Sequence, residues 1–390
     1  MSAEFIKMIS ELHEERFNVH LAKMAQNRTP CGVFSGFDFN PENLAKNIQI
    51  LVKNGLNVSC AIVITDMQTN ALKNIVDVPI ITLENFPNFN EENSLVAKPQ
   101  AVFMTHEFKD LSFTQYFARC GIEMLTTSDD EVFLRIMKHL PEIYSVYEML
   151  DSDESKKVFC AAIKGYLTGK ISDYRFAPEP QYFLNGFLPQ KGDIAIDGGT
   201  YDGATSIDFA KCGANVYAFE MDADNYKKCQ ARLEVFGKNC DVIIENLGLS
   251  DKTGEERYSP FGTASRKTSN GKLTAKFIDL DTYVARNNLP RVDYIKLDIE
   301  GAELDMLHGA AKTISRCKPK MAISAYHKLE DLWTLATYVK SLRADYNFEF
   351  RHYRIDCKDY TLNDTERAVL KYFGLDYFVS TPYEMILYCK

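Results

Sequence analysis

The strongest chemical signal in the sequence is a glycine-rich stretch that follows a short apolar run. Residues 192–203 read GDIAIDGGTYDG, which predicts a buried strand, a tight turn and the start of a helix. Such a unit points backbone N–H groups and the positive end of a helix dipole at one spot, where a nucleotide-type cofactor can bind. The glycines lack the G-x-G-x-x-G spacing of dinucleotide sites. Asp197 at the strand end would repel a pyrophosphate, whereas it favours the sulfonium and ammonium groups of S-adenosylmethionine. We therefore expect the turn to bind S-adenosylmethionine through Asp197, Gly198, Gly199, Tyr201 and Gly203.

The next two predicted strands end in residues that suit the same cofactor. Glu220 lies about 20 residues after the glycine turn, where an acidic side chain can accept hydrogen bonds from both ribose hydroxyls. Met221 follows it and would pack either on the adenine or in the core. Asn246 follows the third strand, where the topology of the sheet places the adenine edge. All three belong to the predicted cofactor site.

The fourth predicted strand ends in two carboxylates, within VDYIKLDIEGAE at residues 292–303. In an extended backbone Asp298 and Glu300 project to the same side, and two like charges there need a cation, a proton or several donors. The candidate partners are the cofactor's ammonium group, a divalent metal and the N-terminus of the helix opened by Gly301. The alternative is that one of the carboxylates caps this helix. We favour a catalytic and cofactor-binding role for Asp298 and carry Glu300 as a second catalytic candidate.

A histidine ends the fifth predicted strand, in MAISAYH. Methylation of an alcohol removes the hydroxyl proton as the oxygen attacks the methyl group, and a histidine at this edge can act as the general base. We therefore expect His327 to be catalytic. A role at the start of the helix that Lys328 opens is the competing interpretation. His352, inside the following strand, is expected to be packed or to support the site.

The segment between the third and fourth strands is polar. Ser259–Lys272 is dominated by Ser, Thr, Gly and Lys, which predicts a mobile loop near the site. Arg266 or Lys267 would contact a hydroxylated or anionic acceptor there, unless the loop is only solvated. Asp279 or Asp281 would complete an oxygen-ligand metal site with the two carboxylates, or Asp281 would cap the helix that follows.

Composition limits the class of protein. A chain of 390 residues favours two domains, and a net charge of −9 argues against a nucleic-acid partner. The ten cysteines are scattered without a C-x-x-C pair, which is typical of reduced thiols in a cytoplasmic protein. No apolar run is long enough to span a bilayer, and the first residues do not have the pattern of a signal peptide.

Alternating strands and helices predict an α/β protein with two Rossmann-like parts. We expect a smaller Rossmann-like domain over residues 1–127, a helical connector over 128–180, and a methyltransferase-type domain over 181–390, whose mostly parallel sheet ends in an antiparallel strand. The strands expected in the first part are Cys31–Phe34, Val58–Thr65, Pro79–Thr82, Ala101–Thr105 and Ile122–Thr126. Those expected in the last part are Asp193–Asp197, Val216–Glu220, Val242–Glu245, Val292–Asp298, Lys320–Tyr326, Phe348–Arg354 and Glu384–Tyr388.

The N-terminal sheet lacks a full nucleotide-binding fingerprint. Its first turn keeps Gly32 and Gly36 only, and Asp66 after the second strand is the acid placed to meet a ribose. We expect this sheet to serve packing, dimerisation or substrate recognition. The exposed edge strands of this sheet could pair with a second copy of the chain, so a homodimer is one of the alternatives.

Residues from about 181 to 390 resemble the FkbM family of S-adenosylmethionine-dependent methyltransferases. The resemblance rests on IDGGTYDGATS, YAFEMD, VDYIKLDIEGAE followed by LHGA, ISAYHKLEDLW, FRHYRID and YEMILYCK in this order. It implies O-methylation by a Rossmann-like domain, often of a sugar or a hydroxylated natural product. By the same resemblance Asp197, Gly199 and Glu220 would hold the cofactor, and Asp298 and His327 would face the reaction. Two segments depart from the family pattern, namely residues 356–376 and the first 180 residues.

The leading hypothesis is an S-adenosylmethionine-dependent O-methyltransferase that acts on a hydroxyl of a small-molecule or carbohydrate acceptor, with His327 as the base. One alternative is a nicotinamide-dependent sugar oxidoreductase that uses the N-terminal sheet, although the incomplete glycine turn there counts against it. The other is a non-catalytic scaffold that binds the cofactor without turnover.

Overall fold

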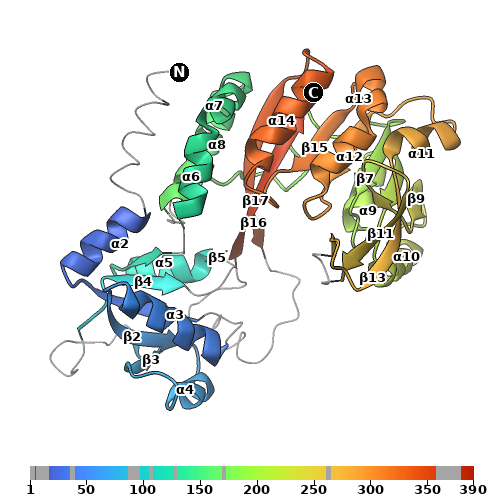
Figure 1. Ribbon diagram of the computed structural model, residues 1–390. Coiled ribbons are helices and arrows are strands. Elements are labelled where there is room, and N and C mark those ends of the chain that lie inside the picture. Colours follow the sequence, from blue (N-terminus) through green and yellow to red (C-terminus); the bar gives the residue numbers. More distant parts are fainter. Residues whose placement is uncertain are drawn as a thin grey trace. The chain divides into compact units, whose positions relative to one another are not determined.

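A computed structural model of the chain divides into two compact units (Figure 1). It describes residues 5, 17–35, 40–86, 97–104, 109–125, 130–168, 173–260, 265–356 and 379–390. The first unit consists of Met1–Leu140, Val158–Phe176 and Arg354–Tyr383, and the second of Pro141–Lys157, Ala177–Tyr353 and Glu384–Lys390. Each unit thus combines segments that lie far apart in the sequence. The domain boundaries after residues 127 and 180 stay predictions.

The first unit contains a five-stranded parallel sheet in the order β3-β2-β1-β4-β6. This confirms the predicted α/β pattern, with each strand within two residues of its expected bounds. The strands are β1 (Pro30–Phe34), β2 (Asn57–Val63), β3 (Ile80–Thr82), β4 (Ala101–Met104) and β6 (Glu123–Leu125). The helices around them are α2 (Phe17–Gln26), α3 (Pro41–Lys53), α4 (Asp66–Leu72) and α5 (Leu111–Arg119). Three further helices, α6 (Asp130–Lys138), α7 (Leu140–Met149) and α8 (Asp153–Thr168), lie in the region where a helical connector was predicted. Of these, α6 belongs to the first unit, α7 almost entirely to the second, and α8 is divided between the two.

Helix ends in this unit follow from their capping residues. The side chain of Asn40 accepts hydrogen bonds from the N–H groups of Glu42 and Asn43 at the start of α3, and Pro41 occupies its first turn. The sequence analysis missed α4, whose capping box pairs Thr65 with Gln68. Asp66, considered for a ribose, lies in the first turn of this helix, where a carboxylate stabilises the helix dipole. Gly36 lies outside the described residues.

The second unit is built on seven strands of an eight-stranded sheet, in the order β16-β17-β15-β14-β7-β8-β9. Five neighbouring strands are parallel and β17 is antiparallel to β15, as predicted. The path comprises β7 (Ile194–Gly198), β8 (Asn215–Phe219), β9 (Val242–Glu245), β14 (Tyr294–Leu297), β15 (Lys320–Ser324), β16 (Phe348–Asp356) and β17 (Val379–Cys389). The eighth strand, β5 (Lys109–Asp110), pairs with Ser380–Thr381 at the start of β17, and both segments belong to the first unit.

Helices connect the parallel strands of this sheet. They are α9 (Ala204–Lys211), α10 (Ala223–Phe236), α11 (Leu280–Arg286), α12 (Glu303–Gly309), α13 (Ala311–Cys317) and α14 (Asp331–Leu342). The crossovers β7–α9–β8 and β14–α12–α13–β15 run in opposite directions from the middle of the sheet. Right-handed connections therefore place their helices on opposite faces, and the carboxyl ends of β7 and β14 form the switch point where ligands bind in such sheets.

The helix that was expected to open at Gly301 is in fact two helices, α12 and α13. The break falls between α12 and α13, next to Gly309, where a Cβ atom would lie 2.1 Å from the carbonyl oxygen of Ser250. The chain passes so close to this carbonyl that only glycine fits there.

A second, smaller sheet flanks the predicted mobile loop, and only Ser259 and Arg266–Lys267 of that loop lie in its strands. Its four strands are ordered β10-β13-β11-β12, with bounds Gly248–Leu249, Gly254–Ser259, Arg266–Lys267 and Leu273–Ile278 for β10, β11, β12 and β13. Its polar strands are held by backbone pairing and by a small core of Tyr258, Ala275 and Phe277. Residues 261–264 of the expected loop lie outside the described residues.

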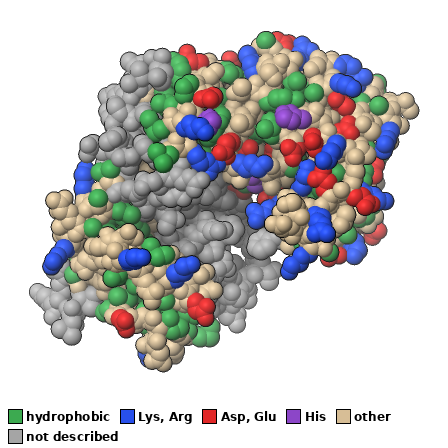
Figure 2. Space-filling model, in the orientation of Figure 1, with side chains coloured by type: hydrophobic (Ala, Val, Ile, Leu, Met, Phe, Trp, Pro, Cys, Tyr) green, Lys and Arg blue, Asp and Glu red, His purple; other side chains and the backbone are tan. Residues whose placement is uncertain are grey.

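The distribution of charged side chains on the surface and the state of the cysteines can be compared with what the composition indicated. On the visible face of the second unit, Lys and Arg side chains are interspersed with Asp and Glu (Figure 2). The cysteines within the described ranges are all free thiols. Among the described residues no helix is both long and apolar enough to cross a membrane.

Candidate functional site

The glycine turn at the end of β7 is shaped by close backbone contact with the end of β14. Gly199 has φ +75°, and a Cβ atom there would lie 1.8 Å from the carbonyl oxygen of Asp298. Gly203, with φ +82°, would clash with the thiol of Cys229 at 2.5 Å. These glycines are therefore required by the packing of the turn itself, before any ligand is considered.

Asp197 lies under this turn with no exposed surface. Ser206 donates a hydrogen bond to its Oδ2, and its Oδ1 lies 3.1 Å from Nζ of Lys296. We expected its negative charge to attract a cationic cofactor, but that charge is already compensated by a buried ammonium group. The charge argument therefore does not apply, and the contacts assign Asp197 to the support of the turn.

Lys296, which the sequence analysis missed, is almost completely buried in the middle of β14. Its ammonium group donates to the carbonyl oxygens of Gly199 at 2.7 Å and Gly198 at 3.3 Å, and lies 5.3 Å from the ring centre of Tyr182. Burial alone would lower its pKa, but the carboxylates of Asp197 and Asp298 outweigh burial and raise it. Lys296 is thus a permanent cation that ties β14 to the glycine turn.

Glu220 links the ends of three segments at the predicted cofactor edge. Its two carboxylate oxygens accept hydrogen bonds from the N–H groups of Tyr201, at 3.0 Å, and Asp222, at 2.8 Å. The side-chain amide of Asn246 donates to the Glu220 carbonyl oxygen at 2.8 Å. Burial raises the pKa of Glu220 to about 7. The turn and the residues after β8 therefore converge on this carboxyl group, and the residue after β9 is bonded to the backbone of Glu220.

Met221, for which adenine contact and core packing were both open, packs against the small core of Tyr258, Ala275 and Phe277. Contact of Met221 with the adenine stays a prediction.

Asp298 receives two hydroxyl donors at the end of β14. Tyr182 donates to Oδ2 at 2.8 Å and Tyr326 donates to Oδ1 at 3.0 Å. Burial would raise the pKa of Asp298, but the positive charges of Lys296 and His327, together with these hydroxyls, lower it. Asp298 is therefore held as a carboxylate at neutral pH.

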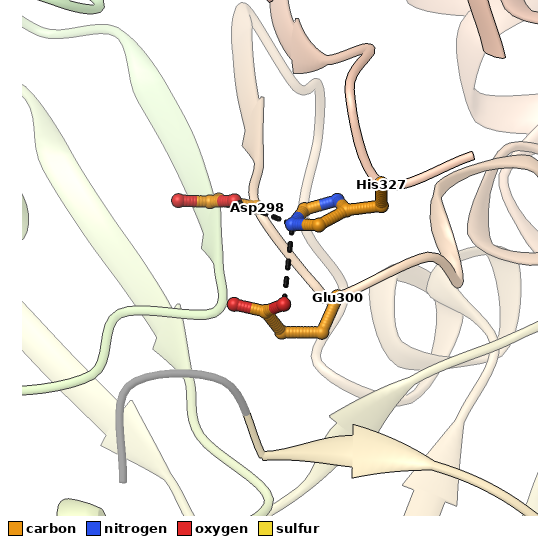
Figure 3. Close-up of side chains that lie close together, drawn as sticks. All are labelled: Asp298, Glu300 and His327. Carbon is orange, nitrogen blue, oxygen red and sulfur yellow. Dashed lines mark ion pairs between the residues drawn. The ribbon is translucent and has the colours of Figure 1, made fainter. Parts of the chain in front are cut away.

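His327 lies between three carboxylates, and Figure 3 shows its ring pointing at two of them. Its Nε2 is 3.3 Å from Oε2 of Glu300 and 3.5 Å from Oδ1 of Asp298, while Nδ1 is 2.9 Å from Oε1 of Glu303. Neither ring nitrogen has a partner aligned for a hydrogen bond among the described residues. Burial would lower the pKa of His327, but the carboxylates, Glu303 foremost, raise it well above the usual value. The raised pKa favours the protonated ring, whereas the expected base would be the neutral imidazole.

The backbone conformation that places Glu300 in this cluster differs from the extended strand that was expected. Strand β14 ends at Leu297, so strand alternation does not align Glu300 with Asp298. Glu300 instead has φ +56° in the turn before α12, a left-handed conformation that non-glycine residues rarely adopt. The two carboxylates are nevertheless adjacent, as predicted.

The capping alternatives are not what the structure shows. Ala302 is the N-cap of α12 and makes no side-chain cap hydrogen bond, so neither Asp298 nor Glu300 caps this helix. The helix after His327 begins only at Asp331, whose carboxylate accepts the N–H of Lys328. A role for His327 at the start of a helix is therefore wrong.

Glu384, on β17, is a further site residue that sequence reasoning missed. Its Oε2 accepts a hydrogen bond from Nε2 of Gln181 at 2.6 Å. Burial, followed by the charge of Asp298, raises the pKa of Glu384 to about 7. The two partners are 203 positions apart in sequence, and no local pattern connects them.

Two other predicted participants have structural partners instead. Lys267 lies 2.8 Å from Glu256 and 3.4 Å from Asp305, so its charge is compensated. Asp279, not Asp281, is the N-cap of α11. Asp281 accepts the N–H groups of Lys312 and Thr313, at 3.0 and 2.7 Å, and is committed to the start of α13.

The strand order, the glycine turn at the switch point and the acidic residue at the end of β8 define a Rossmann-like methyltransferase fold. Within it, residues 197–354 match the model of the methyltransferase FkbM domain, and the chain thus contains a domain of the FkbM family.

Known proteins that are similar to this chain include a curated relative and a solved structure. The hexuronic acid methyltransferase AglP of Haloferax volcanii is 28% identical over 134 residues, which are 32% of this chain and 53% of that protein, so the chain spans about half the length of this curated relative. The crystal structure of methyltransferase FkbM from Methylobacillus flagellatus KT is 20% identical, covers 99% of this chain and 98% of that one, and has a TM-score of 0.65. This second similarity shows that the fold is shared.

Proposed function

We propose that this protein transfers a methyl group from S-adenosylmethionine to a hydroxyl group of a carbohydrate acceptor. The observation that carries the proposal is the FkbM domain, whose predicted cofactor edge converges on Glu220. When bound, S-adenosylmethionine supplies an electrophilic methyl group.

Glu220 fits the role of ribose acceptor. Each of its oxygens accepts one backbone N–H, which leaves a lone pair on each oxygen for a ribose hydroxyl. Asn246 is bonded to the backbone at this position and keeps the ends of β8 and β9 in register. The glycine turn, supported by Asp197 and Lys296, forms the neighbouring wall.

The acceptor hydroxyl must lose a proton during the transfer. Because His327 lies among the carboxylates of Asp298, Glu300 and Glu303, we assign it to charge balance there. Glu384 is the stronger candidate for proton acceptor, because its pKa of about 7 suits a group that takes up a proton near neutral pH and returns it to water.

A carbohydrate acceptor is supported by the relative from Haloferax volcanii, which is a hexuronic acid methyltransferase. The test is incubation of the full chain with S-adenosylmethionine and a panel of hexuronic acids and neutral hexoses, free and as glycosides, with mass spectrometry of the products. We expect one methyl group to be added to at least one sugar, and the reaction to be lost in Glu220→Gln but kept in Glu234→Gln, an exposed acid on α10. Cofactor binding without methylation of any sugar would contradict the carbohydrate assignment.

A further inference from the structure

We propose that Asp298, Glu300 and His327 form a binding site for one divalent transition-metal ion. Each residue offers one ligand atom, and the three atoms lie within 4.8 Å of one another. Nε2 of His327 is 3.3 Å from the Glu300 oxygen and 3.5 Å from the Asp298 oxygen. Two ligands that bind one ion at about 2.0–2.2 Å are themselves about 3.0–3.5 Å apart, so the cluster is already close to ligating geometry.

The orientation of the histidine is the observation that separates this cluster from an ordinary group of acids. The His327 side chain is only 8% exposed, and its Nε2 points at both carboxylates (Figure 3) without a hydrogen-bond partner among the described residues. Its other nitrogen, Nδ1, faces the fully buried carboxylate of Glu303 at 2.9 Å. The charge of this carboxylate favours a proton on Nδ1, and therefore the tautomer that leaves Nε2 for a metal; a carboxylate behind the ring is usual in metal-binding histidines.

The carboxylate ligands are also oriented by their surroundings. The hydroxyls of Tyr182 and Tyr326 hold the carboxylate of Asp298 from two sides. The left-handed backbone of Glu300 turns the chain sharply after β14, which brings its carboxylate within ligand distance of the histidine. Positioning of this kind lowers the cost of assembling a metal site.

The ligand types identify the class of ion. One imidazole nitrogen with two carboxylate oxygens suits Mn²⁺ or Zn²⁺ better than Mg²⁺ or Ca²⁺, which prefer oxygen ligands alone. A divalent ion would also replace the proton of His327 as the charge that balances three carboxylates. Three protein ligands leave a position for an acceptor hydroxyl, whose proton a metal makes easier to remove. This last role rests on the proposed function, whereas binding of the ion does not.

The test is calorimetric titration of the metal-free full chain with Mn²⁺ and with Zn²⁺, without S-adenosylmethionine, with electron paramagnetic resonance to count bound Mn²⁺. We expect one ion per chain. The affinity should fall roughly 100-fold or more in His327→Gln and Glu300→Gln, and about 10–100-fold in Glu303→Gln, which keeps all three ligands but loses the charge behind Nδ1.

The control variant is His308→Gln, an exposed histidine on α12, which should bind the ion like the wild type. Thermal melting of each variant verifies that it is folded. Absence of binding by the wild type, or equal binding by His327→Gln, would overturn the proposal. Since the titration contains neither cofactor nor acceptor, its failure would leave the proposed methyl transfer unaffected.

Discussion

The ammonium group of Lys296 lies 3.1 Å from the carboxylate of Asp197, and the same group bonds the carbonyl oxygens of Gly198 and Gly199 above it. This buried pair joins β7 and β14, the two neighbouring strands whose carboxyl ends form the switch point of the sheet. It explains why a carboxylate follows the apolar run of β7 although it does not reach solvent. The glycine turn thus has a charged support beneath it.

Removal of one member of this pair should be costly. In Lys296→Met the carboxylate of Asp197 stays buried without its cation, and we expect the free energy of unfolding to fall by about 3–5 kcal/mol. Urea denaturation measures this, with the exposed Lys276→Met as the control. A loss below about 0.5 kcal/mol, the size expected at the surface, would show that the pair does not support the turn.

A side chain at Gly199 should disrupt the turn directly. Gly199→Ala places a methyl group 1.8 Å from the Asp298 carbonyl oxygen at φ +75°, so β7 and β14 must separate. We expect a large drop in melting temperature and loss of cofactor binding. Gly254→Ala is the matched control, because a Cβ atom there meets nothing within 4 Å and its φ is not positive. Equal behaviour of the two variants would contradict the close packing described here.

Stability should decrease as the pH rises from about 5 to 8. Glu220 and Glu384 have pKa values near 7 in the folded protein against 4.5 in the unfolded chain, so the folded state holds their protons longer. Their stabilising contribution is complete below about pH 4.5 and is lost toward pH 7, by up to about 3 kcal/mol for each group. The raised pKa of His327 acts in the same direction, and the lowered pKa of Asp298 keeps that group charged throughout this range.

Melting temperatures measured between pH 5 and 8 check this dependence. Glu384→Gln, which resembles the protonated acid, should melt at a temperature that depends less on pH, whereas the exposed Glu234→Gln should follow the wild type. A steeper dependence in Glu384→Gln would mean that Glu384 is charged in the folded protein at pH 5.

His327 should separate turnover from cofactor binding. In His327→Ala we expect the affinity for S-adenosylmethionine to stay within about threefold and kcat to fall at least roughly tenfold, because the histidine organises the carboxylates at the reacting edge rather than the ribose site. Steady-state kinetics and a binding titration on the same preparation give both values. An unchanged kcat would contradict a role of His327 in the methyl transfer.

The fold was predictable to a large extent because its signals are local. The strand Val242–Glu245, for example, has the bounds that its apolar run indicated, although it is only partly buried. The small sheet around β11 was not predictable, since the side chains of β11 are mostly polar and β10 and β12 contain only two residues each. The break after Gly309 depends on contact with Ser250, which no local pattern reveals.

The acids and the histidine of the site could be predicted from the sequence, but their contacts and pKa values could not. Asp298, Glu300 and His327 were expected together because they follow neighbouring strands, and they do lie together. The pKa of His327 depends on Glu303, and that of Asp298 depends on Lys296. In the sequence, Lys296 is only a single polar residue within an apolar strand. Glu384 joins the site from the end of the chain, so its shifted pKa arises only in the folded structure.

Calorimetric titration of the full chain with S-adenosylmethionine, with NAD as comparator, tests the central claim most directly. We expect S-adenosylmethionine to bind one equivalent per chain, NAD not to bind, and Glu220→Gln to bind the methyl donor about 10–100-fold more weakly, as loss of a charged hydrogen-bond acceptor predicts. The exposed Glu234→Gln should bind it like the wild type. Binding of NAD without binding of S-adenosylmethionine, or full affinity in Glu220→Gln, would contradict the assignment of this edge of the sheet to the methyl donor.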